Sequence, residues 1–210
     1  MRHIKLFEQF INEYGQQPGD LNMADEASQL DYIKRNSKYE TALDKIENPS
    51  EKVQLAAVKA NPQELRFIKD PSEKVQIAAV SIDSHKFKNT ITAIGANFDN
   101  AIQHIDKPSE KVQLAAVAKF GYAIQHIKNP SDRVKMTAIE SDPTAIEYIE
   151  APSEELQLAA IANGRKAQGS VVIGLIENPT EAAQIAAITQ NPHILKYINN
   201  PTDKVKALAK

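Results

Sequence analysis

The feature that most constrains the fold of this chain is a short string of residues that returns at a regular interval. Pro-Ser-Glu-Lys-Val-Gln begins at Pro49, Pro71 and Pro108. Variants of the string begin at Pro130, Pro152, Pro179 and Pro201. Four of the six intervals are 22 residues long, one is 37 and one is 27. A period in this range indicates small structural units that bury their apolar faces by stacking on their neighbours.

Each unit is predicted to start with an α-helix. Asn48 is predicted as the N-cap, Pro49 as the first helical residue and Glu51 as the third, from which its side chain can reach back to the cap. Lys107 and Ala151 take the place of Asn48 in two other units. Because neither carries a capping side chain, we expect weaker helix starts there.

A second, shorter helix is predicted in each unit, beginning at Asn61-Pro62 in the first complete one. Its apolar residues are Leu65 and Ile68, and an isoleucine stands three residues before the repeated proline in all seven units. Aromatic residues make up only 6% of the chain, while alanine and isoleucine dominate the apolar set. This composition suits closely packed helices better than sheets, so we expect an all-α fold.

The repeats are similar to two known families. Ile68-Lys69-Asp70-Pro71, continued through Val75, Ala79 and Val80, resembles the leucine-rich repeat variant, and Leu114-Ala115-Ala116-Val117 resembles an uncharacterised bacterial and viral repeat. The first resemblance implies a right-handed α-solenoid, HEAT-like in general plan, in which α-helices alternate with short α- or 3-10 helices. Such families specify architecture better than function.

The chain is predicted to consist of two parts. Residues 1–20 form an amphipathic N-terminal segment and linker, and residues 21–210 form the helical-repeat array. Within the array, residues 21–48 are predicted to be a degenerate cap and residues 49–210 the repeats. Insertions are predicted near 83–97 and 163–170, with a local change of superhelix direction at the first.

The first 13 residues resemble the start of many proteins of large, T4-like tailed phages. In those phages such leaders direct proteins into the prohead and are cleaved after a motif that Ile11-Asn12-Glu13 matches. This resemblance implies a phage-encoded protein of the host cytoplasm or the virion interior. A plain amphipathic helix that covers the first repeat is the alternative.

Composition excludes several classes of function. The formal charge of -2 gives no overall basic field for nucleic acid or an anionic membrane. The absence of cysteine excludes disulfides and thiol nucleophiles. We expect neither a transmembrane segment nor a secretory signal, because no apolar run is long enough and Glu8 interrupts the N-terminal one.

Repeated positions form rows of side chains, and two rows are candidate binding surfaces. The residue after the repeated valine or its equivalent is glutamine in five units: Gln54, Gln76, Gln113, Gln157 and Gln184. The residue before the repeated isoleucine is aromatic or histidine in five: Phe67, His104, His126, Tyr148 and Tyr197. The glutamines either line a polar groove or occupy half-exposed helix positions. The rings either bind a partner or pack on the next repeat.

A basic row near the helix starts comprises Lys52, Lys74, Lys111 and Arg133. It either attracts an acidic or phosphate-bearing partner or forms a solvated face. Recurrent carboxylates such as Glu51 are explained by the predicted capping position. No polar residues form a single constellation distinct from its copies in other repeats, so we expect no catalysis, metal site or cofactor.

The sequence therefore predicts a non-catalytic scaffold that binds a protein partner of host or phage. Three alternatives stay open: an internal head or structural protein of a phage delivered by the leader, sequestration of a small-molecule or nucleotide ligand, and weak nucleic-acid binding through the basic row.

Overall fold

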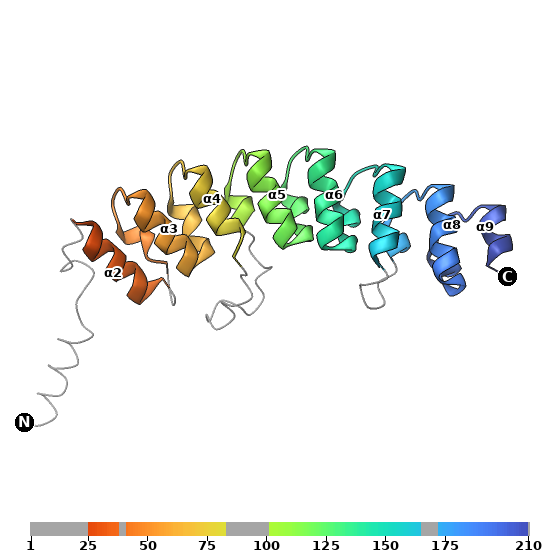
Figure 1. Ribbon diagram of the computed structural model, residues 1–210, viewed down its shortest axis with the longest axis horizontal. Coiled ribbons are helices and arrows are strands. Elements are labelled where there is room, and N and C mark those ends of the chain that lie inside the picture. Colours follow the sequence, from red (N-terminus) through yellow and green to blue (C-terminus); the bar gives the residue numbers. More distant parts are fainter. Residues whose placement is uncertain (1–24, 38–40, 83–100, 165–171, 210) are drawn as a thin grey trace, which may run out of the picture. The chain divides into compact units, whose positions relative to one another are not determined.

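The computed structural model describes residues 25–37, 41–82, 101–164 and 172–209. Within them all regular secondary structure is helical, and α-helices alternate with short 3-10 helices, written η (Figure 1). The all-α prediction is therefore confirmed for this part of the chain. The N-terminal segment with its cleavage motif and the insertion near 83–97 lie outside the described residues, as does most of the insertion near 163–170.

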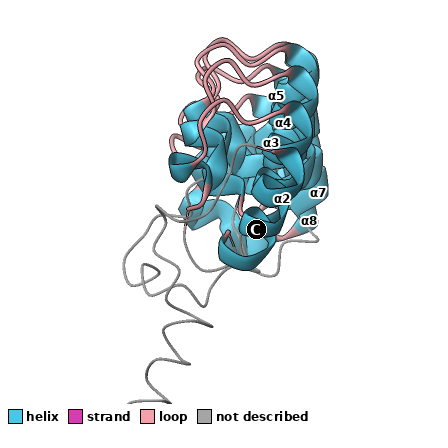
Figure 2. Ribbon diagram, turned by 90° about the vertical axis from the view of Figure 1, so that its left-hand side faces the viewer, coloured by secondary structure: helices cyan, strands magenta, loops and turns pink. Residues whose placement is uncertain are grey.

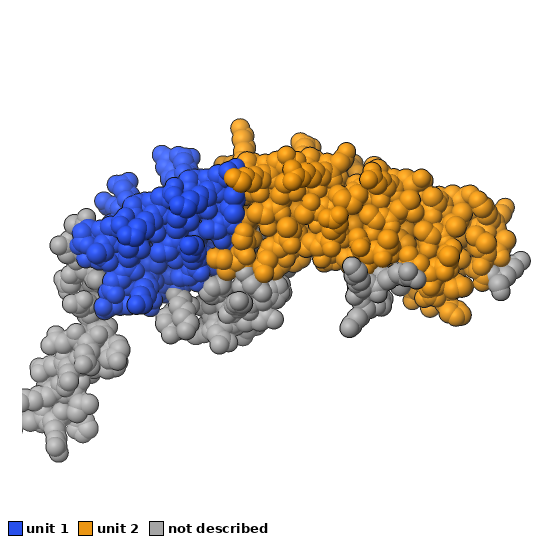
Figure 3. All heavy atoms as spheres, viewed as in Figure 1, with its two compact units in different colours: residues 1–79, 84–98 blue, residues 80–83, 99–210 orange. Residues whose placement is uncertain are grey.

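The chain divides into two compact units, the first made of residues 1–79 and 84–98 and the second of residues 80–83 and 99–210 (Figure 3). The described helices of unit 1 are α2 (Glu26–Asn36), η1 (Leu43–Lys45), α3 (Glu51–Ala60), η2 (Pro62–Phe67) and α4 (Glu73–Val80), whose last residue belongs to unit 2. Those of unit 2 are η5 (Ala101–His104), α5 (Glu110–Lys119), η6 (Gly121–His126), α6 (Asp132–Ser141), η7 (Pro143–Tyr148), α7 (Glu154–Gly164), η8 (Val172–Leu175), α8 (Glu181–Gln190), η9 (Pro192–Tyr197) and α9 (Asp203–Leu208).

Helices that follow one another in the repeat order pack side by side. In unit 1, α2 packs on α3 and η1 on η2. In unit 2, each α-helix from α5 to α9 packs on the next, and the 3-10 helices do the same from η5 to η8. Unit 2 therefore has an α-helical layer beside a layer of 3-10 helices (Figure 2).

The α-helices begin two residues later than the sequence pattern predicted. Ser50 is the N-cap of α3, its hydroxyl accepts a 3.4 Å hydrogen bond from the Val53 N–H, and Glu51 is the first helical residue. The prediction of Asn48 as N-cap and Glu51 as third residue is wrong. The predicted weak starts are also wrong, because Ser109 and Ser153 cap α5 and α7 in the same way. A serine or threonine hydroxyl competes well for this role, since it meets an N–H that has no partner within the helix.

The residue predicted as the cap has a different role, which is to turn the chain between η1 and α3. Asn48 has a φ of 49°, in the left-handed region, and the equivalent residues Asp70, Asn129 and Asn200 lie at 51–52°. Asn and Asp tolerate this conformation better than other residues with a Cβ. Ala151, with a φ of 44°, has no such compensation. Backbone conformation thus explains Asn or Asp at these four positions.

Three of the described 3-10 helices begin at a capping residue followed by proline, as predicted. Asn61 is the N-cap of η2, with Pro62 following, and its side-chain oxygen accepts a 3.1 Å hydrogen bond from the Gln63 N–H. Asp142 and Asn191 cap η7 and η9 in the same way, at 2.9 and 3.0 Å. Proline fits here because its fixed φ suits the first helical residue and it lacks the N–H that would otherwise have no partner.

The core is built from the same positions in most repeats, although Ile105 and Leu195 are only half-buried. In the first complete repeat Val53, Ala57 and Val58 come from the α-helix, and Leu65 and Ile68 come from the 3-10 helix and the residue after it. Small alanines at the position of Ala57 permit close approach of neighbouring helices. The predicted second-helix residues Leu65 and Ile68 are confirmed as buried.

Candidate functional site

The glutamine row is bonded to the backbone of its own repeats. The side-chain Nε2 of each glutamine donates a hydrogen bond of 2.8–3.0 Å to the carbonyl oxygen of the proline five residues earlier. The pairs are Gln54–Pro49, Gln76–Pro71, Gln113–Pro108, Gln157–Pro152 and Gln184–Pro179. Each bond satisfies a carbonyl in the turn that precedes the α-helix. The geometry favours a structural role for this row over the predicted polar groove.

Two of these glutamines also connect consecutive repeats. The side-chain oxygen of Gln157 accepts a 2.8 Å hydrogen bond from the Thr180 N–H, and that of Gln184 accepts a 3.2 Å bond from the Thr202 N–H. Thr180 and Thr202 are the N-caps of α8 and α9. Gln157 and Gln184 are only 3% and 4% exposed, so their amides are directed into the array and not toward a ligand.

Two lysines of the basic row, and the lysine at the same position of α9, form ion pairs with the preceding α-helix. Lys52 lies 2.8 Å from Glu26, Lys74 lies 3.1 Å from Glu51, and Lys204, at the same position of α9, lies 3.3 Å from Glu181. All three pairs are exposed, so each contributes little to stability. They nevertheless give these lysines partners inside the array, which favours the solvated-face interpretation.

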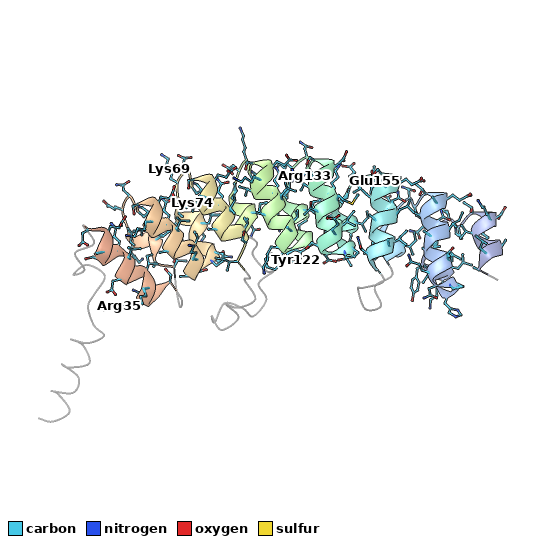
Figure 4. All side chains as sticks on the ribbon, in the orientation of Figure 1. Arg35, Lys69, Lys74, Tyr122, Arg133 and Glu155 are labelled. Carbon is cyan, nitrogen blue, oxygen red and sulfur yellow. The ribbon has the colours of Figure 1, made fainter. Side chains whose placement is uncertain are left out.

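The two remaining members of the basic row, Lys111 and Arg133, are exposed at the second residue of α5 and α6. Glu155 takes this position in α7, so the charge of the row changes sign between α6 and α7. Figure 4 shows Arg133 and Glu155 along the same edge of unit 2, while Tyr122 lies at the opposite edge. The row is therefore not a continuous cationic surface.

The recurrent carboxylates at the helix starts accept hydrogen bonds from the following repeat. The hydroxyl of Ser50 donates to Glu26 at 2.6 Å, and that of Ser131 donates to Glu110 at 2.6 Å. Hydrogen bonds from Lys52 and then from Ser50 hold the pKa of Glu26 below its usual value, and Lys74 with Ser72 does the same for Glu51. These acids therefore belong to contacts between repeats.

One buried carboxylate was not recognised as special in the sequence. Glu64 is fully buried and accepts hydrogen bonds of 2.7 and 2.9 Å from the N–H groups of Ala42 and Leu43. It supplies the N-terminal cap of η1, where the Ala42 side chain provides none. Burial raises the pKa of Glu64, and the two backbone hydrogen bonds oppose that rise. The sequence contains a signal for this residue, because a glutamate stands where the equivalent residues, Ala123 and Ala145, are small and apolar.

The aromatic row lies at the C-terminal ends of the 3-10 helices. Phe67 ends η2 in unit 1, with 38% of its surface exposed. In unit 2, Tyr148 ends η7 and Tyr197 ends η9, with 45% and 46% exposed, while His104 and His126 are half-buried at the ends of η5 and η6. The structure therefore brings four of the five predicted residues onto the 3-10 layer of one unit. Leu175 takes the same position in η8.

Two of the exposed rings are covered by a cation from the preceding residue. The guanidinium of Arg66 lies 4.8 Å from the centre of the Phe67 ring, and the Lys196 ammonium lies 4.8 Å from that of Tyr197. Both distances are typical of cation–π contacts. Tyr148 differs, because the residue before it is Glu147.

Within the described ranges, no helix is both long and apolar enough to cross a membrane. In that same part of the chain, no three or more His, Asp or Glu side chains gather in a way that could hold a metal ion. Comparison of the chain with family models, with curated proteins and with solved structures finds no match.

Proposed function

We propose that this chain is a right-handed α-solenoid of 22-residue repeats and acts as a non-catalytic scaffold that binds a protein partner. The partner docks on the 3-10 layer of unit 2, where Tyr148 and Tyr197 are the principal contacts and His104 and His126 extend the row. The observation that carries the proposal is the exposure of these tyrosine rings at one repeated position.

Many of the other repeated polar residues already have partners within the chain, which leaves the tyrosines as the better candidates for binding. The glutamines bind proline carbonyls, the serines and threonines cap helices, and Lys52 and Lys74 pair with acids of the preceding helix. A nearly half-exposed tyrosine contributes little to the core. Tyrosine is, however, enriched at protein interfaces, because it offers a large contact area with few rotatable bonds and a polar tip.

Site-specific photo-crosslinking tests the proposal. A photoreactive phenylalanine analogue is placed at Tyr148 or Tyr197, and as a control at Glu140, an exposed residue near the end of α6. We expect a discrete cross-linked protein from the tyrosine positions and none from the control position.

The identified partner is then purified, and its affinity is measured for the Tyr148→Ala and Tyr197→Ala variants. We expect a weakening of about tenfold or more for each, the size typical of removing a central aromatic contact. Equal cross-linking from the control position, or unchanged affinity in both variants, would contradict the proposal.

A further inference from the structure

We propose that the binding site at η7 takes an arginine side chain of the partner, stacked on the Tyr148 ring and paired with the carboxylates of Glu147 and Glu150. This inference rests on the proposed function and names the chemistry of the partner at one repeat.

Two other repeats show how a ring at this position is covered. Lys196 lies over Tyr197 in η9, and Arg66 lies over Phe67 in η2, each cation coming from the residue directly before the ring. A side chain at that position thus reaches the ring face. In η7 the corresponding side chain is Glu147, an anion, which the negative face of a ring does not attract.

No other part of the described structure supplies the missing cation. Tyr148, Glu147 and Glu150 are all exposed, and none of their side chains makes a hydrogen bond, ion pair or ring contact with a described residue. The position of Glu147 is occupied by Gln125 in the preceding repeat and by Gly174 in the following one. The surface therefore presents a ring face and two carboxylates whose charge no cation among the described residues neutralises by direct contact.

Arginine fits this combination better than lysine. Its planar guanidinium stacks on an aromatic face while its N–H groups remain free to donate two parallel hydrogen bonds to a carboxylate. Lysine offers a compact charge that is more strongly hydrated and has no planar face. The negative charge of the site thus favours a cation, and the Tyr148 ring favours a planar cation such as guanidinium.

Nuclear magnetic resonance titration with a blocked tripeptide, acetyl-Gly-Arg-Gly-amide, tests the inference on the full chain. We expect saturable shift changes at the amides of Glu147, Tyr148 and Ile149 that weaken as salt is added, because exposed charge pairs are screened. The tripeptide with citrulline in place of arginine has the same shape without the charge, and it should produce none of these changes. Equal shifts with citrulline, or equal affinity for the lysine tripeptide, would overturn the assignment.

Three variants locate the binding. Tyr148→Ala should weaken it by roughly threefold to tenfold, the range expected when an exposed cation–π contact and its neighbouring charge pair are disturbed. Glu147→Lys should abolish binding, since the new lysine can cover the ring as Lys196 covers Tyr197. Glu140→Ala, at an exposed residue near the end of α6, is the control and should leave binding unchanged. Circular dichroism checks that each variant folds.

Unchanged binding in both Tyr148→Ala and Glu147→Lys would overturn the inference. This outcome is distinguishable from failure of the proposed function. If Tyr148 cross-links to a partner but the arginine probe does not bind, the function stands and the arginine assignment falls.

Discussion

The side-chain oxygen of Gln157 accepts a 2.8 Å hydrogen bond from the backbone N–H of Thr180, while its Nε2 donates to the carbonyl oxygen of Pro152 at 2.9 Å. One amide thereby joins the turn before α7 to the N-cap of α8. Gln184 repeats the arrangement between Pro179 and Thr202. These contacts connect neighbouring repeats through backbone groups, so they depend little on which residues occupy the surrounding surface.

We expect Gln157→Ala to lower the free energy of unfolding of the chain by about 1–3 kcal/mol, because it leaves a carbonyl and an N–H without their partner. Urea denaturation followed by circular dichroism measures the change. Gln113→Ala is the matched control, since Gln113 also binds a proline carbonyl but is half-exposed, where water can replace the lost bond. An equal or larger loss in Gln113→Ala would contradict this account.

Ala151→Gly should raise the free energy of unfolding by about 1 kcal/mol, because glycine removes the steric cost of a left-handed residue that carries a Cβ. The φ of 44° at Ala151 is the basis of this expectation. Thermal and urea unfolding provide the measurement. The same change at Ala118, an exposed residue of α5, should instead cost about 1 kcal/mol, the usual penalty for glycine in a helix. The prediction is wrong if both variants are destabilised alike.

Gly121→Ala should destabilise unit 2 by about 1–3 kcal/mol, the usual cost of overpacking a tight interior. A Cβ at Gly121 would lie 2.5 Å from the carbonyl oxygen of Ala138 and 2.7 Å from the Cβ of Asp142. Gly174→Ala is the control, because its Cβ would meet the backbone oxygen of Tyr197 at an ordinary 3.5 Å. Differential scanning calorimetry should show a lower transition temperature for the first variant alone. A tolerated Gly121→Ala would mean that η6 can move away from α6.

The pH dependence of stability should reveal the buried carboxyl of Glu64. Because its pKa is raised in the folded state, the folded chain binds more protons than the unfolded chain between the usual glutamate value and the raised one. The contribution of Glu64 to the free energy of unfolding is therefore fully present at pH values below the pKa of the unfolded chain. It is lost as the pH rises through the pKa of the folded chain.

Comparison with Glu64→Gln, a neutral side chain of similar shape, isolates this effect. The stability of the wild-type chain relative to the variant should fall as the pH rises from about 4.5 toward neutral, the lower value being the usual glutamate range. Urea midpoints of both proteins across that range provide the test. A relative stability that rises with pH would show that the Ala42 and Leu43 N–H bonds outweigh the cost of burial.

Much of the described fold could be predicted from the repeated pattern. The helical class, the burial of Leu65 and Ile68, and the caps at Asn61, Asp142 and Asn191 follow from local chemistry that acts within a few residues. The α-helix starts could not be predicted as reliably. Asn48 and Ser50 are both good capping residues two positions apart, and the choice between them depends on the turn that the preceding 3-10 helix imposes.

In the candidate site, too, some features could be predicted from the sequence and others could not. The sequence by itself determined which residues share a repeated position, because the repeat places copies of one residue at the same point of every unit. Only the tertiary structure decided what each row does. It joins the Gln157 amide to the N-cap of the next repeat, pairs Lys74 with Glu51, and leaves Tyr148 exposed. The physical reason is that these hydrogen bonds and the burial of side chains depend on groups in the adjacent repeat, about 20 residues away in sequence. The period of the pattern does not say which face of a helix the adjacent repeat covers.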